Sequence, residues 1–116
     1  MKIIAHNYKD KKLAEVISDE ILIQNIDDAL VLLGDLYYQG YDLIVVDESN
    51  LTPQFFNLKT KLAGEILQKF TQYQMRLVIV GDFKKYNSNS LQDFIYESNK
   101  GTQVNFVQNK NKFIEP

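Results

Sequence analysis

Two aspartates stand just beyond apolar runs in the middle of the chain. Asp47 directly follows residues 43–46, and Asp82 follows residues 77–80 after a single glycine. Continuous runs of branched apolar residues are typical of strands buried on both faces of a parallel sheet. Ligand sites in such sheets gather at the carboxyl ends of the strands. If these two strands are neighbours, both carboxylates lie at one edge and could share Mg²⁺, which prefers oxygen ligands.

Both aspartates also have an ordinary structural explanation. An acidic side chain after a strand commonly caps a turn or faces water. We favour this explanation for Asp47 and Asp82, and it makes Glu48 one more solvated acid.

The segment that follows Asp47 carries a second group of candidates. Thr52 precedes a proline at the predicted start of a helix, where free backbone N–H groups can bind an anion such as phosphate. Thr52 is equally well explained as an N-cap with Pro53 at the first helical position, and we prefer this. Asn50 and Gln54 lie on the same joint, and we include them among the residues expected to contact a ligand or partner.

The loop after Asp82 contains two lysines and an aromatic residue. Lys84 and Tyr86 could contact a phosphorylated ligand or a nucleic acid. Two lysines do not form a basic patch in a chain of net charge −2, so we expect a solvated loop and no nucleic acid partner. Lys84 and Tyr86 stay among the candidate binding residues.

Hydrophobic spacing and capping signals predict the elements that position these residues. A hairpin is expected over residues 2–6 and 13–17, and a helix runs from an Asn25 cap to Gly40. A second helix is predicted from Pro53 to about Tyr73. An open alternative makes residues 53–56 a separate turn and Asn57 the cap. A Ser90-capped helix and a strand over residues 104–107 follow.

The order of these elements, β-β-α-β-α-β-α-β, defines the predicted fold class. Strands that alternate with helices indicate parallel pairing with right-handed crossovers. We therefore expect one α/β domain over residues 1–116. Its sheet would be mixed and mostly parallel, with about four to five strands and three to four helices. The polar tail over residues 108–116 is expected to fray, apart from a turn at Phe113 and Ile114 that docks on the domain.

Composition narrows the function classes. The chain is 45% hydrophobic and 24% charged, which is ordinary for a soluble globular protein. It has no cysteine and one histidine, His6, which we place on an edge strand, so a zinc site and a cysteine nucleophile are not expected. The glycines do not have phosphate-loop spacing. We expect no catalytic residue, no metal ligand set and no cofactor.

Localisation and partners follow from the same features. No apolar run approaches the roughly 20 residues that span a bilayer. We therefore expect no membrane association and a cytoplasmic location. Tyr37, Tyr38 and Tyr41 surround Gly40, and such a cluster fits either an interface or a packed helix end. The expected partner is another protein, with a second copy of the chain as an open alternative.

Three stretches of sequence resemble an uncharacterised bacterial family, a domain of unknown function of about this length. They begin LGDLYYQG, LTPQFFNLKTKLAGE and GDFKKYNSNSLQDF, and they occupy residues 33–40, 51–70 and 81–101. The resemblance covers nearly the whole chain. It implies no activity, since none is established for that family.

The element order also resembles the domain shared by sulfate transporters and anti-sigma-factor antagonists (STAS). In that domain a strand leads through a loop to a helix that carries a phosphorylatable serine. The corresponding joint here is residues 49–54, which lacks the Asp-Ser-Ser-Gly pattern and has Gln54 or Phe55 near the acceptor position. The resemblance implies a STAS-like fold and a regulatory role without catalysis.

Two functions follow as hypotheses. The first is a non-catalytic cytoplasmic regulatory or protein-interaction module that acts through residues 47–54 and 81–89. The second is a small metal-dependent enzyme or ligand-binding protein that acts on a phosphorylated small molecule through Asp47 and Asp82.

Overall fold

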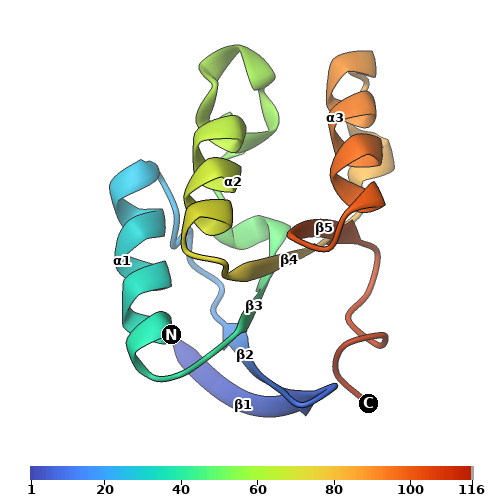
Figure 1. The fold of residues 1–116 in the computed structure, drawn as a ribbon. Coiled ribbons are helices and arrows are strands. Elements are labelled where there is room, and N and C mark those ends of the chain that lie inside the picture. The colour runs from blue at the N-terminus through green and yellow to red at the C-terminus, as the bar shows by residue number, and fades with distance from the viewer. Residues whose placement is uncertain (116) are drawn as a thin grey trace.

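The computed structural model describes residues 1–115 as a mixed sheet of five strands with helices packed on it (Figure 1). The strand order is β1-β2-β3-β4-β5. Only the β1–β2 pair is antiparallel, and the other three pairs are parallel. The strands are β1 (Lys2–Tyr8), β2 (Lys11–Ile17), β3 (Leu43–Asp47), β4 (Arg76–Val80) and β5 (Val104–Val107), and the α-helices are α1 (Ile26–Tyr38), α2 (Leu62–Gln72) and α3 (Asn89–Lys100). The predicted α/β class with a mostly parallel sheet is confirmed.

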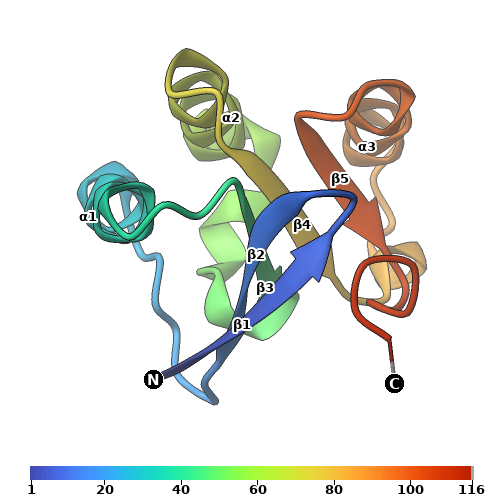
Figure 2. The same ribbon diagram turned by 60° about the horizontal axis from the view of Figure 1, so that its bottom comes forward.

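All three helices cover one face of the sheet, and the C-terminal segment crosses the other (Figures 1 and 2). The main core lies on the helix side. On the opposite face, Phe113 and Ile114 are each 6% exposed and pack on residues of β2, β3 and β4. The predicted docking turn is therefore confirmed, and this part of the tail packs on the sheet instead of fraying.

The hairpin and the first helix form for local reasons. Lys9 and Asp10 have φ angles of 48° and 65°, the positive values that suit a tight two-residue turn between antiparallel strands. The Asn25 side chain accepts a hydrogen bond from the Asp28 backbone N–H at 2.8 Å, as expected for an N-cap. Gly40 follows the C-cap of α1 with φ +84°, which confirms its predicted place.

The predicted helix from Pro53 to Tyr73 is wrong in its first half. Residues Pro53–Phe56 (η2) and Leu58–Thr60 (η3) are two short 3₁₀ turns, and α2 begins only at Leu62. The Thr60 hydroxyl donates to the carbonyl oxygens of Gln54 and Asn57, both at 2.8 Å. These carbonyl groups would otherwise take part in a continuous helix.

The alternative of a separate turn over residues 53–56 is therefore correct, but Asn57 caps η3 instead of α2.

The predicted cap of α3 is also wrong. Ser88, not Ser90, has extended backbone, and its hydroxyl accepts from the Leu91 N–H at 3.2 Å.

The tyrosine cluster at the end of α1 divides in the structure. Tyr41 is 8% exposed, whereas Tyr38 is 92% exposed and Tyr37 contacts Tyr73 edge-on. His6 lies on β1, an edge strand, as predicted. None of the helices within residues 1–115 has the length and apolar character needed to cross a membrane.

Candidate functional site

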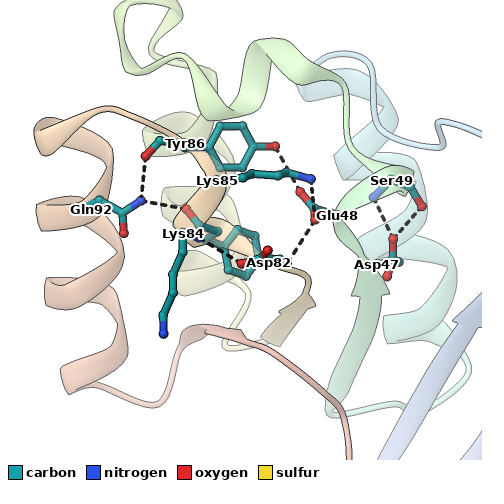
Figure 3. A network of polar contacts seen from close by, with 9 residues as sticks. Asp47, Glu48, Ser49, Asp82, Lys84, Lys85, Tyr86 and Gln92 are labelled. Atoms are coloured by element: carbon teal, nitrogen blue, oxygen red, sulfur yellow. Dashed lines mark hydrogen bonds and ion pairs between the residues drawn. The ribbon is translucent and has the colours of Figure 1, made fainter.

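The two segments selected from the sequence meet at one edge of the sheet. β3 and β4 are parallel neighbours, and Asp47 pairs with Val80 in their register. Residues 47–54 after β3 and residues 81–89 after β4 therefore begin side by side (Figure 3). We call these two segments together the strand-end surface.

Glu48 joins the two halves of the strand-end surface. Its Oε1 accepts from the Asp82 backbone N–H at 3.1 Å and from Lys85 Nζ at 2.9 Å. Its Oε2 accepts from the Tyr86 hydroxyl at 3.1 Å. The Glu48 side chain is only 14% exposed, so the expectation of a solvated acid is wrong. Three donor groups share one carboxylate because the loop after β4 folds over it.

Gly81 permits this approach. A Cβ atom built at Gly81 would lie 2.7 Å from both Cδ and Oε1 of Glu48. Non-bonded atoms in proteins do not come that close, because interiors are already close-packed. A side chain at position 81 would therefore displace Glu48. The residue after β4 must therefore be glycine for Glu48 to keep its position.

Tyr86 is held on both its ring and its hydroxyl. The ring stacks on Phe56 with centroids 4.9 Å apart and an interplanar angle of 16°. Burial and the hydrogen bond to Glu48 raise the pKa of Tyr86 to about 12, so its hydroxyl stays a donor at neutral pH. Gln92 on α3 fixes the backbone behind it by donating to the carbonyl oxygens of Phe83 at 2.7 Å and Tyr86 at 3.1 Å (Figure 3).

The two aspartates each cap their own turn. Asp47 Oδ2 accepts from the backbone N–H and the hydroxyl of Ser49 at 2.9 and 2.6 Å. Asp82 Oδ1 accepts from the Lys84 N–H at 3.3 Å. Within residues 1–115 no group of three His, Cys, Asp or Glu side chains is placed to hold a metal ion. The geometry therefore gives the shared Mg²⁺ site no support.

Asn50 is a structural residue of the joint. It is fully buried, and its Oδ1 accepts from the Asp47 N–H at 3.0 Å. Its Nδ2 donates to the carbonyl oxygens of Ser18 and Glu20, both at 2.9 Å. These bonds tie the loop before α1 to the end of β3, and they leave the Asn50 side chain out of reach of a partner.

The remaining candidates lie at the surface. Thr52 Oγ1 accepts from the Gln54 N–H at 3.4 Å, which confirms its capping role in η2. Gln54 and Lys84 are exposed. Among the described residues Lys84 forms no ion pair, so its charge is available to a partner.

A shallow groove of about 310 Å³ runs between the two halves of the strand-end surface. Ile21, from the loop before α1, lies at its margin and is 44% exposed. The rest of the lining mixes apolar and polar groups, namely Asp47, Glu48, Ser49, Leu51, Pro53, Phe56, Lys85 and Tyr86. We call it the strand-end groove.

A second polar cluster was not identified from the sequence. Glu15 of β2 is 6% exposed, its Oε1 lies 2.8 Å from His6 Nε2, and its Oε2 pairs with Lys110 of the tail. Burial raises the pKa of the Glu15 carboxyl, but hydrogen bonds and charge from Lys110 and His6 outweigh it and lower the pKa below 4.5. The available signal was an acid inside the apolar run of β2, on the same face as Leu13.

Comparison with known proteins identifies a family but no activity. No curated protein and no solved structure matches the sequence. The likeness to the STAS domain therefore stays a prediction. A family described as "Domain of unknown function (DUF4180)" matches residues 8–115, the region that contains the strand-end surface. The chain belongs to this family of uncharacterised domains.

Proposed function

We propose that this chain is a non-catalytic regulatory or protein-interaction module of the cytoplasm, and that its partner binds the strand-end surface. The observation that carries the proposal is the way Glu48 uses its carboxylate. It binds Asp82, Lys85 and Tyr86 of the facing loop and thereby holds two distant segments as one preformed surface.

The polar groups of this surface have structural partners. Asp47 and Asp82 cap turns, and Glu48 and Tyr86 bind each other. A general base or nucleophile needs a reactive atom that faces the substrate. Here both oxygens of Glu48 and one oxygen of each aspartate instead accept hydrogen bonds from neighbouring N–H and O–H groups, which supports binding over catalysis.

The strand-end groove supports a protein segment as the occupant. The rings of Phe56 and Tyr86 and exposed Ile21 at its margin give the groove apolar surface, while Asp47 and Lys85 provide charge of both signs. Aromatic and apolar contact surface beside polar groups is the usual composition of a protein interface. Exposed Lys84, on the same loop as Lys85 and Tyr86, adds a positive charge to the strand-end surface that favours an acidic residue in the partner.

Site-specific photo-cross-linking in the native host tests this proposal. A photoreactive amino acid at exposed Gln54 reports on the strand-end surface, and one at Tyr38, at the opposite end of the domain, is the matched control. We expect one protein to cross-link through position 54 and not through position 38. Cross-linking through position 38 alone would contradict the proposal and would place the interface at the tyrosine cluster.

A further inference from the structure

A basic cleft that shares no residue with the strand-end surface lies between the tail, on the helix-free face of the sheet, and the end of α3. It encloses about 480 Å³ and is formed by residues from the β1–β2 turn, the start of β4, the end of α3, β5 and the tail. Its lining includes four cationic side chains and no aspartate or glutamate. The cationic residues of this basic cleft are Lys9, Arg76, Lys100 and Lys112.

Three of these cations, Lys9, Arg76 and Lys112, are brought to one place because the tail crosses the open face of the sheet (Figure 2). Phe113 of the tail packs against Tyr8 with ring centroids 5.1 Å apart. Lys112 Nζ lies 5.9 Å from the Phe113 ring, and Arg76 Cζ lies 5.7 Å from the same ring. Lys9 Nζ lies 5.3 Å from the Tyr8 ring. Three cations from separate parts of the chain thus lie beside two aromatic rings.

Little of this positive charge is neutralised within residues 1–115. Lys100 pairs with exposed Glu97 at 3.1 Å, and none of the other three cations takes part in an ion pair there. Asp42 lines an adjoining hollow that Arg76 also borders, but its carboxylate accepts from the Lys12 N–H at 2.9 Å. The cleft is therefore positive although the chain has a net charge of −2.

Arg76 shows the lack of a neutralising charge most directly. Its Nη2 donates to the amide oxygen of Asn105 at 3.0 Å, and its buried Nε has no hydrogen-bond partner. A partly buried cation that faces only neutral groups is unfavourable, because its lost hydration is not replaced by an opposite charge. An anion in the cleft would supply that charge.

We propose that the basic cleft binds a small phosphate monoester that carries a planar ring. A phosphate group has about −1.5 to −2 charges at neutral pH and three acceptor oxygens, which several converging cations can share. The arginine fork matches phosphate geometry. The cleft volume lies within the range of about 300–1,000 Å³ typical of small-molecule sites, and the half-buried Tyr8 ring offers an aromatic surface for the ring of the ester. This inference is independent of the proposed protein-binding role.

Titration calorimetry on the full chain tests it, with phenyl phosphate, inorganic phosphate and sulfate as probes at one low ionic strength. We expect one saturable site for phenyl phosphate and weaker binding of both inorganic anions. Tighter binding of inorganic phosphate than of phenyl phosphate would contradict the ester assignment. Absence of saturable binding by any of the three anions would overturn the site itself.

Variants then locate the binding. Lys9 and Lys112 are exposed, so the double variant K9Q/K112Q keeps the fold intact, and we expect at least about tenfold weaker phenyl phosphate binding from lost charge-assisted contacts. The matched control K2Q/K59Q removes the same charge from exposed lysines outside the cleft and should leave the affinity unchanged. Equal weakening by both double variants would show a non-specific charge effect and contradict the site.

Discussion

Glu48 accepts a hydrogen bond from the Tyr86 hydroxyl at 3.1 Å across 38 residues of sequence. The same carboxylate accepts hydrogen bonds from the Asp82 N–H and the Lys85 ammonium group. The ends of β3 and β4 therefore do not carry two independent loops. A change at Glu48 should alter both halves of the strand-end surface together.

Replacing Glu48 by alanine tests this linkage. We expect E48A to lower the free energy of unfolding by about 2 kcal/mol, because the Asp82 N–H and Tyr86 hydroxyl lose a charged acceptor. Lys85 adds little, since its side chain is 53% exposed. Urea denaturation measures the change. E97A is the control, because Glu97 is 67% exposed and its loss should cost no more than about 0.5 kcal/mol. Equal effects of the two variants would contradict the linkage.

Gly81 and Glu48 should show coupled effects. G81A places a methyl group within 2.7 Å of Glu48 Oε1 and should cost about 1–3 kcal/mol through overpacking. In the E48A background the clashing atoms are gone, so the same substitution should cost less than about 0.5 kcal/mol. G64A in α2 is the control, since its Cβ meets nothing within 4 Å and should stabilise the helix. Additive costs of G81A and E48A would refute the predicted contact.

The phenol of Tyr86 should ionise at unusually high pH. Its folded pKa is raised from 10.0 to about 12. A raised pKa stabilises the fold fully below the unfolded value of 10.0, and this contribution is lost as pH rises through the folded value of about 12. Ultraviolet titration of the native protein should show a late-ionising phenol that is absent in Y86F. If Y86F instead lost a phenol that ionises near the unfolded value of 10.0 and kept the late-ionising one, the hydrogen bond to Glu48 would be contradicted.

Glu15 should make the stability of the fold depend on pH in the acid range. Its folded pKa is below the unfolded value of 4.5, so its contribution is present above 4.5 and is lost as pH falls through the lowered folded value. We expect wild type to be more stable than E15Q at neutral pH, with the difference disappearing in acid. Thermal unfolding at a series of pH values measures it. A difference that persists at the acid end would show that charge on Glu15 is not the cause.

The sequence predicted the parts of the fold that depend on neighbouring residues. The branched apolar runs of β3 and β4, the Asn25 cap and Gly40 each carry a local signal, and each was identified correctly. The start of α2 was missed because Thr60 hydrogen-bonds to backbone groups of Gln54 and Asn57, a competition that periodicity does not reveal.

The sequence indicates that the two candidate segments lie side by side if β3 and β4 are neighbours, but it does not reveal the contacts between them. That Asp47 and Asp82 meet at one edge follows from strand order. That Glu48 is the central residue depends on the loop after β4 folding back, which brings Lys85 and Tyr86 to it from 37 and 38 residues away. Glu15 was missed for the same reason, because Lys110 reaches it across 95 residues.

The central claim is that a protein partner binds the strand-end surface, and the affinity of the K84E variant for the partner cross-linked through position 54 tests it most directly. Exposed Lys84 has no structural contact through its side chain among the described residues, so its reversal leaves the fold unchanged. The account predicts binding at least about tenfold weaker for K84E. It predicts unchanged binding for K11E, which reverses an exposed lysine at the start of β2, at the opposite end of the strands. Equal affinity of K84E and wild type would contradict the claim.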